Sequence, residues 1–392
     1  MSKLNDLIKS LCSNDIKYIC VKDIVDVVND YKSIKKNSIS KFGQFPVIDQ
    51  GKKFISGYSN DESLVIKKGE FIIFGDHTRE IKYINFPFIP GDSGVKVLTV
   101  NKDFVLCKYV YHCLKNLEIT NRGYNRHWTV LAPMTIPVPP VEVQNEIVKI
   151  LDKFSELEAS LEAELKARIS QYDFWREKLC GGELSYLIQE EKARRIKLNK
   201  ICEVGTLTRG KRFVKADAVE DGVACIHYGE LYTYYGISAY KTKSYINEKL
   251  ANKLRFAEKG DVVIVGAGEN NVDIGVGVAW LGEEKPAIHD ACYIFKHPFN
   301  PKYISYYLRT KLYHNQLKRW VSEGKICAVS AKGIGECIIP IPSVARQNEI
   351  VSILDMFDKL INDITVGIPA EIELRRKQYE YYRNKLLNFE EI

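Results

Sequence analysis

The chain has 392 residues, of which 45% are hydrophobic, and its 57 Lys and Arg outweigh 50 Asp and Glu to give a net charge of +7. This composition supports packed cores and excludes a mainly disordered chain, and the length corresponds to about two or three domains. No apolar run approaches the ~18 residues that cross a bilayer. The start, with Lys3, Asp6 and Lys9, does not have the pattern of a secretory signal.

Ten cysteines are scattered singly along the chain, and none of them forms a Cys-x-x-Cys pair. In a chain of this length without a secretory signal, we expect reduced thiols and a cytoplasmic location rather than disulfides. No metal site is expected, because neither these cysteines nor the seven histidines have metal-ligand spacing.

Residues 1–141 are predicted to form a first β-rich module. The runs FPVIDQ, FISGY, EFIIFG and KVLTV are rich in Val, Ile, Tyr and Phe and are broken by Gly, Asn and Asp. A short amphipathic helix is expected at KYVYHCLKN, residues 108–116. The module closes with an apolar run and Pro-x-Pro, which ends a strand.

Residues 142–192 are predicted to form a central helical spacer region. Between Gln144 and Leu179 the sequence contains no Gly or Pro, and apolar side chains recur at intervals of three and four. A helix over this range would be about 54 Å long. Its apolar stripe includes Ile147, Leu151, Phe154 and Leu161.

Residues 193–345 are predicted to form a second β-rich module that resembles the first. Lys67–Thr78, KKGEFIIFGDHT, matches Glu258–Glu269, EKGDVVIVGAGE, and KYVYHCLKN matches KYISYYLRT, residues 302–310. The sequence therefore predicts one module used twice.

Residues 346–392 repeat the helical region. IPVPPVEVQNEIVKILDKF, from Ile136, aligns with IPIPSVARQNEIVSILDMF, from Ile339, and a break is expected at Gly367–Pro369. The matching apolar stripe consists of Ile350, Leu354, Phe357 and Ile361. Matched stripes favour mutual packing of the two helices over two unrelated surface helices, each packed on its own domain.

Arg168 and Arg375 occupy matching positions on these stripes, where a nearby carboxylate is the expected partner. The predicted fold class is therefore α+β. Two β-rich domains alternate with two long helices that pair as an antiparallel coiled-coil spacer, with a pseudo-twofold internal repeat.

The positive charge is concentrated in the two modules. Residues 1–141 have 20 basic against 14 acidic residues and residues 193–345 have 23 against 15, whereas both helical regions are acidic overall. This pattern is typical of nucleic-acid-binding heads on a protein-facing scaffold, although an ordinary solvated surface would also account for it.

Loops that mix Arg, Lys, Asn, His and Tyr are the candidate DNA contacts, because these side chains read base edges and hold phosphates. A single Tyr in a β-rich domain is otherwise a core or strand-face residue. The predicted DNA-binding residues are Lys52, Lys53, His77, Thr78, Arg79, Arg122, Asn125, Arg126, Arg209, Lys211, Arg212, Tyr232, Tyr234, Asn270 and Asn271.

Motifs of a catalyst are missing from the sequence. It has no GxxxxGK[ST] phosphate loop, no dinucleotide fingerprint, no Asn/Asp-Pro-Pro-Tyr element and no HExxH. The ExK triplet at Glu283–Lys285 has no suitable upstream Asp on a strand and is expected to be a surface turn. We therefore predict a non-catalytic chain without a cofactor.

Two modules, each closed by Pro-x-Pro and a QNEIVxILD helix, resemble the DNA-specificity subunit of type I restriction–modification enzymes over essentially the whole chain. The resemblance implies that each module is a target-recognition domain for one half of a bipartite DNA sequence. It implies that the helices set the gap between the half-sites and dock two methyltransferase subunits. These subunits would bind S-adenosylmethionine and methylate adenine, and a separate motor-nuclease subunit would cut unmethylated DNA.

Two other interpretations stay open at this point. The chain could guide a methyltransferase without any nuclease. Alternatively, it could be a coiled-coil adaptor whose basic domains bind protein or RNA, in which case duplex DNA would not compete for the modules.

Overall fold

The computed structural model describes residues 2–12, 16–91, 94–181, 197–324 and 326–389. The chain forms two compact units, residues 1–162 with 371–392 and residues 163–370. The predicted end of the central helical region and the first residues of the second module lie within residues 182–196, outside the described residues.

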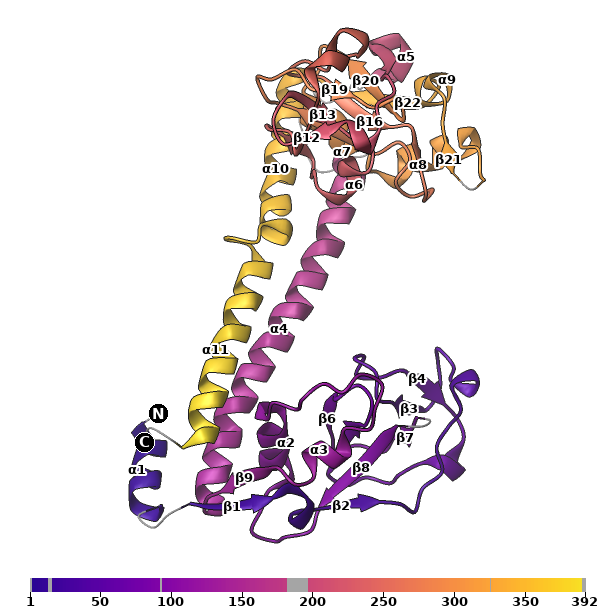
Figure 1. The fold of residues 1–392 in the computed structure, drawn as a ribbon. Coiled ribbons are helices and arrows are strands. Elements are labelled where there is room, and N and C mark those ends of the chain that lie inside the picture. Colours follow the sequence, from indigo (N-terminus) through magenta and orange to yellow (C-terminus); the bar gives the residue numbers. More distant parts are fainter. Residues whose placement is uncertain (1, 13–15, 92–93, 182–196, 325, 390–392) are drawn as a thin grey trace, which may run out of the picture. The chain divides into compact units, whose positions relative to one another are not determined.

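The first unit contains a mixed α/β module and parts of two long helices (Figure 1). Its elements are α1 (Ser2–Leu11), β1 (Lys17–Cys20), β2 (Val25–Val28), β3 (Phe45–Ile48), β4 (Gly57–Ser59), β5 (Phe71–Gly75), β6 (Ile81–Ile84), β7 (Ile89–Pro90), β8 (Val95–Val100), α2 (Cys107–Asn116), α3 (Trp128–Leu131), β9 (Thr135–Val138), the start of α4 (Val141–Cys180) and most of α11 (Ile368–Asn388).

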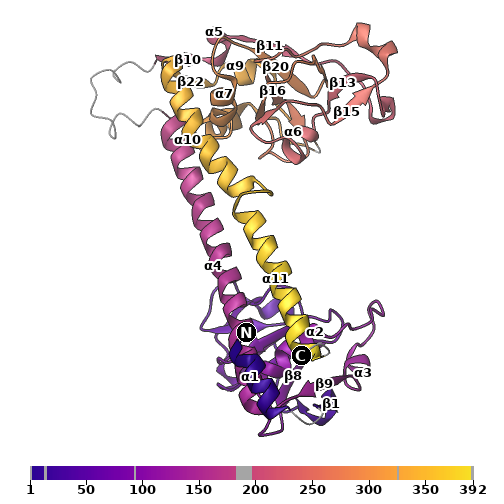
Figure 2. The ribbon, with the colours of Figure 1, turned by 90° about the vertical axis from the view of Figure 1, so that its left-hand side faces the viewer.

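The second unit contains the end of α4, a second α/β module and α10 (Figure 2). Its other elements are β10 (Lys197–Lys200), α5 (Ile201–Val204), β11 (Thr206–Arg209), β12 (Ala218–Val219), β13 (Val223–Ile226), α6 (Glu230–Thr233), β14 (Ser238–Ala239), β15 (Ser244–Ile246), β16 (Val262–Val265), β17 (Ala267–Gly268), β18 (Gly277–Trp280), β19 (Ala287–Ile288), β20 (Cys292–Lys296), α7 (Pro301–Tyr307), α8 (Lys311–Leu317), β21 (Cys327–Ala328), α9 (Ala331–Gly335), β22 (Ile338–Ile341) and α10 (Val344–Asn362).

The two modules share one sheet topology. The order β2-β8-β5-β6 in the first corresponds to β11-β20-β16-β18 in the second, which adds β14 at one edge. In each module a second sheet contains a parallel pair, β3 with β7 and β13 with β19. A separate antiparallel pair closes each module, β1 with β9 and β10 with β22. The expected duplication is thus visible in the strand order.

Alternating apolar and polar residues, or continuous apolar runs, explain why these segments form buried strands. The Val262–Val265 strand is buried at every position, as expected for a central strand covered on both faces. In the first module, helix α2 packs against β5, β6 and β8, and in the second α7 packs against β16 and β18. The sheets and these helices form the cores from which the loops extend.

The long helices pack in antiparallel fashion within each unit. In the first unit the Phe154 ring lies 5.4 Å from Tyr382, and Arg376 of α11 binds Glu158 and Glu162 further along α4. In the second unit the Tyr172 ring of α4 lies 6.4 Å from Phe357 of α10. The α+β fold class with an antiparallel helical spacer is therefore confirmed.

The second helical region is interrupted between α10 and α11. The break covers residues 363–367, so it begins four residues before the predicted Gly367–Pro369 segment, and Pro369 lies in the first turn of α11. The Asp363 side chain accepts a hydrogen bond from the Thr365 amide at 2.7 Å. A Cβ on Gly367 would lie 2.5 Å from the Asp363 carbonyl oxygen, so this turn has no room for a side chain.

The repeated glutamine of the QNEI motif explains the motif structurally. Gln144 is fully buried; its amide nitrogen donates to the carbonyls of Phe104 and Pro139, and its oxygen accepts from the Leu106 amide. Gln347 donates to the Pro342 carbonyl. It also accepts from the amide of Asn300, the residue that caps α7. Each glutamine joins the Pro-x-Pro strand end, the long helix and the start of the short helix.

A second matched network joins the short and long helices. Asp152 of α4 forms an ion pair with Lys108 at 2.7 Å and contacts His112 at 3.3 Å. In the second module Asp355 forms an ion pair with Lys302, and the Tyr306 hydroxyl donates to it at 2.6 Å. The two copies differ in one group, which is a histidine in the first and a tyrosine in the second.

No helix within the part of the chain that the structure describes is long and apolar enough to span a membrane. All ten cysteines are free thiols, and most of them are buried.

Replacing Gln144 by Leu is expected to lower the free energy of unfolding of the first unit by about 2 to 3 kcal/mol, because buried carbonyl and amide groups lose their partners. Denaturant unfolding followed by circular dichroism measures the change. The control is Asn145→Leu, which also replaces an amide side chain by Leu but at the exposed neighbouring position. Equal losses in the two variants would contradict a bridging role for Gln144.

Replacing His112 by Tyr is expected to reduce the acid sensitivity of the first unit. His112 is 1% exposed, and burial lowers its pKa from the ordinary 6.5, although Asp152 opposes this shift. The folded chain therefore binds fewer protons than the unfolded chain below pH 6.5, so stability from this group is complete above pH 6.5 and is lost as the pH falls toward the folded-state pKa.

The measurement is the free energy of unfolding as a function of pH between 8 and 5. His112→Tyr should lower the number of protons that the chain takes up on unfolding by at most one. Stability at pH 8 serves as the folding control. An unchanged pH slope would show that His112 does not titrate differently in the folded and unfolded chains.

Candidate nucleic-acid interface

Three loops of the first module meet beside the ends of β3 and β5. Gln50, just after β3, accepts a hydrogen bond from the His77 amide at 3.2 Å, and its carbonyl accepts from the Thr78 hydroxyl at 2.5 Å. The Asp76 carbonyl and carboxylate bind His127 and the amide of Trp128. The loops 49–53, 76–79 and 121–128 are therefore fastened to one another, and we call them the first loop face.

The predicted residues of the first module are on this face, and most are exposed. Lys52, Lys53, Thr78, Arg122, Asn125 and Arg126 are exposed, whereas His77 and Arg79 are half-buried. Arg79 adopts a left-handed backbone with φ of 65°, and its guanidinium donates to the Ile119 carbonyl at 3.0 Å. Arg79 thus holds the turn together, whereas the two lysines and the other two arginines are exposed.

Two features of this face were missed by the sequence analysis. The Tyr124 ring is 84% exposed and stacks on the His77 ring at 4.5 Å with an interplanar angle of 5°. Buried Lys82 donates to the carbonyls of Asp49 and Lys53, which fixes the loop that carries Lys52 and Lys53. Tyr124 could have been found from the sequence, because it stands between Arg122 and Arg126 in NRGYNRHW and flat exposed rings suit base or sugar contact.

Corresponding loops of the second module also meet. The amides of Gly210 and Lys211 donate to the carbonyls of Cys292 and Ile288, and the Arg209 side chain donates to the Asp290 carbonyl at 2.7 Å. Loop 266–273 joins them through the Gly266 amide, which donates to Ala291. We call residues 209–213, 227–236, 266–273 and 288–292 together the second loop face.

A cluster of rings occupies this second face. The His227 and His289 rings lie 4.5 Å apart, Tyr228 packs against both of them, and Phe213 contacts His289 at 5.1 Å. Burial lowers the pKa of His289, and the neighbouring His227 lowers it further. The sequence analysis did not single out His289, because nothing near it in the sequence suggests that it meets His227.

The predicted DNA-binding residues of the second module differ in how exposed their side chains are and in whether they bind other loops. Lys211 and Arg212 are exposed, while the Arg209 side chain is used to hold loop 289–291. Tyr234 is exposed and lies under the Lys243 ammonium at 4.8 Å, whereas Tyr232 is half-buried.

Two predicted amides of this face bind acidic partners. Asn270 donates to Asp273, and Asn271 donates to Glu323 at 2.9 Å. Asn270 therefore uses one donor within its own loop, and Asn271 uses one to hold Glu323.

The predicted helix-pairing residues lie mostly in the interior of the units. Ile147 and Leu151 belong to the first unit's core together with Leu386 and Leu387, and Phe154 stacks on Tyr382. In the second unit's core are Ile350, Leu354 and Ile361, with Phe357 packed against it. Leu161 is 9% exposed.

The two matched arginines bind within their own helices. Arg168 contacts Glu164 and Gln171, and Arg375 contacts Glu371 and Gln378. Their partners follow the same spacing in both copies.

Within the described residues no group of three or more His, Cys, Asp or Glu side chains could hold a metal ion. The two faces instead combine exposed cations, amides and rings, a set suited to contacts with phosphates and base edges.

Comparisons with known proteins agree with this chemistry. A family model for the type I restriction modification DNA specificity domain matches residues 13–171 and 191–374. The chain is 29% identical to the type I restriction enzyme EcoR124I/EcoR124II specificity subunit of Escherichia coli, over 99% of this chain and 98% of that protein. It is 28% identical to a putative specificity subunit of Haemophilus influenzae, over 97% of both chains.

Solved structures of similar fold were also found. The S subunit of a type I restriction-modification system from M. genitalium matches with a TM-score of 0.54 and 17% identity, over 96% of this chain and 97% of that chain. A chain from a study of complex assembly in a type I R-M system matches with a TM-score of 0.57 and 14% identity, over 94% and 97%. At these identities the likeness concerns the fold.

Neutralising Lys211 and Arg212 with Gln is expected to weaken duplex binding and to reduce the slope of log affinity against log salt by about 2, since each lost phosphate contact removes about 0.9. Arg209 is left intact because its side chain holds a neighbouring loop. The matched control replaces Lys149 and Lys166, exposed cations of α4, with Gln. If both double variants keep the original affinity and slope, loop 209–213 does not contact the DNA backbone.

Proposed function

We propose that the two loop faces read the two halves of one bipartite DNA target. The premise is that this chain belongs to the family of type I restriction–modification DNA-specificity subunits. The family model covers most of the chain, which is a non-catalytic DNA sequence-recognition subunit. The half-site assignment rests on one observation in particular. Two modules of the same strand order carry loop faces of different chemistry.

The first loop face offers an exposed tyrosine stacked on His77, with Arg122, Asn125 and Arg126 from one loop. The second offers Lys211 and Arg212 beside a cluster of two histidines and Tyr228. Different donors, acceptors and ring surfaces select different base edges, so the halves of the target should differ in sequence. The sheets behind the faces, which share one strand order, support both sets of loops.

Assembly with the other subunits of a restriction–modification complex follows from family membership. The finer proposal is that the helices dock two methyltransferase subunits, because the Gln144 and Gln347 motifs give two copies of one local structure. A motor-nuclease subunit and a cytoplasmic location belong to the same proposal. An adaptor that binds protein or RNA is not favoured, since the family model names DNA specificity.

Changing Arg122 and Tyr124 to Ala is expected to relax one half of the target only. The wild-type chain, expressed with its methyltransferase partner, should give methyladenine at a split motif with a fixed gap, as read by modified-base sequencing. In the double variant one half of the motif should become degenerate, because each lost base contact removes about 1 to 3 kcal/mol of discrimination between bases. The other half and the gap should stay the same.

Tyr240→Ala, at an exposed tyrosine outside both loop faces, is the control and should keep the full motif. A variant in which both halves change together would contradict independent reading by the modules. An absence of methylation with a folded wild-type chain and an active partner would favour the adaptor instead.

A further inference from the structure

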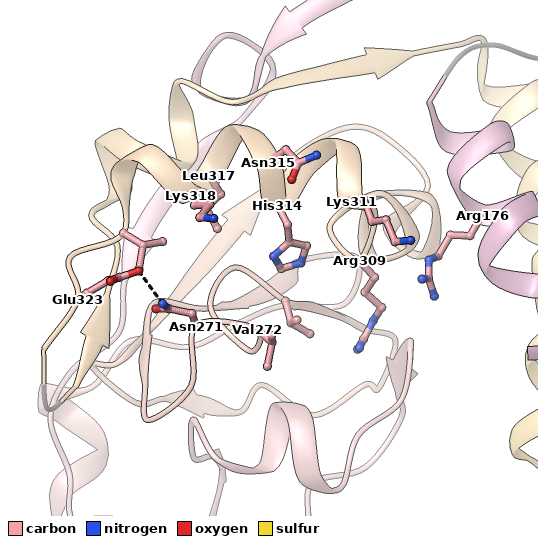
Figure 3. A pocket seen from close by; sticks show the side chains of 12 residues that line it. Arg176, Asn271, Val272, Arg309, Lys311, His314, Asn315, Leu317, Lys318 and Glu323 are labelled. Atoms are coloured by element: carbon pink, nitrogen blue, oxygen red, sulfur yellow. Dashed lines mark hydrogen bonds between the residues drawn. The ribbon is translucent and has the colours of Figure 1, made fainter. Parts of the chain in front are cut away.

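A cavity of about 620 Å³ in the second unit is not explained by base reading. Its wall includes side chains from α4, from the α7–α8 corner, from α8 and from the loop before β18 (Figure 3). Arg176, Arg309, Lys311, His314 and Lys318 contribute basic groups, and Glu323 contributes a carboxylate. The cavity is therefore predominantly basic.

Two of the arginines that line this cavity each have a buried side-chain nitrogen without a partner. The Nε atoms of Arg176 and Arg309 are buried and have no hydrogen-bond partner within the described part of the chain. Other atoms of these groups are held, since Arg309 donates to the carbonyls of Gly236 and Gly277 and Arg176 pairs with Asp173. An anion bound beside these guanidinium groups would offset part of the cost of burying their charge.

The charges are separated within the cavity. Glu323 and Asn271 bind each other at one end, and Arg309, Lys311 and Arg176 gather at the other (Figure 3). His314 lies between them, and its pKa is lowered by burial and, among other causes, by the positive charges of Arg309 and Arg176. The nearby carboxylate of Glu177 is already occupied, because it accepts from the amides of Lys311 and Leu312.

Apart from Asn315, the remaining wall is apolar. Val272, Val276, Leu317 and Val321 line it, and the cavity is much larger than an inorganic phosphate requires. Sites of this size with an apolar wall and a few placed charges are typical of small organic ligands. A ligand with a phosphate at one end and a flat apolar group at the other would match both parts of the wall.

We propose that this cavity binds a nucleoside monophosphate, with its phosphate between Arg176, Arg309 and Lys311 and its base against the apolar wall. The ligand is a free phosphomonoester rather than duplex DNA. These basic residues line a cavity, so a phosphate has to enter it to reach them, and a terminal phosphate enters more easily than one flanked by two sugars of a duplex. The proposal goes beyond DNA recognition and does not depend on it.

Calorimetric titration of the full-length chain with adenosine 5′-monophosphate, adenosine and inorganic phosphate tests the proposal. Adenosine 5′-monophosphate should bind in the micromolar to millimolar range, adenosine should not bind measurably, and phosphate should bind more weakly. The double variant Arg176→Gln, Lys311→Gln should weaken nucleotide binding at least tenfold, as expected for loss of charge-assisted hydrogen bonds.

Arg309 is not changed, because its contacts with Gly236 and Gly277 support the fold. The matched control is Arg319→Gln with Lys332→Gln, exposed cations of the same unit that do not line the cavity. The control should bind the nucleotide like the wild type. Circular dichroism and thermal unfolding of all variants verify that each is folded.

Absence of nucleotide binding at millimolar concentration, or equal binding by wild type and the Arg176/Lys311 variant, would overturn the proposal. Equal affinity for phosphate and nucleotide would also reject it, since the apolar wall would then contribute nothing. If only duplex binding falls in the variant, the cavity serves the DNA backbone instead. Duplex binding by the wild type without nucleotide tests the recognition role separately.

Discussion

The buried glutamine at the start of each long helix is the constraint on which each module depends. Gln144 and Gln347 are fully buried, and each exchanges hydrogen bonds with main-chain groups of two other segments. Inside a core an amide of this kind cannot be exchanged for an apolar group without leaving main-chain groups unpaired. It therefore fixes where the closing strand ends, where the long helix begins and where the short helix lies against it.

Acidic residues further along the long helices add a second attachment. Asp152 and Asp355 each receive a lysine and a second donor from the short helix. The sheets packed on these short helices carry the loops. In the function proposed above, recognition rests on loops that are tied to one another, such as Gln50 to His77 and Arg209 to Asp290.

The sequence predicted the frame better than it predicted the site. The repeated QNEI motif, Pro-x-Pro ends and apolar stripes are local signals with a fixed period, and they led to the helices and to the duplicated module. The role of Arg79 and Arg209 as loop supports could not be read from composition, because their partners at Ile119 and Asp290 are 40 and 81 residues away. His289 was missed for the same reason. Its meeting with His227 follows from the parallel pairing of β13 with β19, a tertiary relation.

The glutamine bridges have a consequence for how new specificities arise. Their partners are main-chain groups: every residue supplies the carbonyl in the same form, and every residue except proline supplies the amide. The bridge is therefore indifferent to the side chains of the segments it joins. The side chains of the joined segments can therefore change without loss of these hydrogen bonds, as long as the backbone keeps its path. A scaffold held through its backbone leaves its sequence free to diversify.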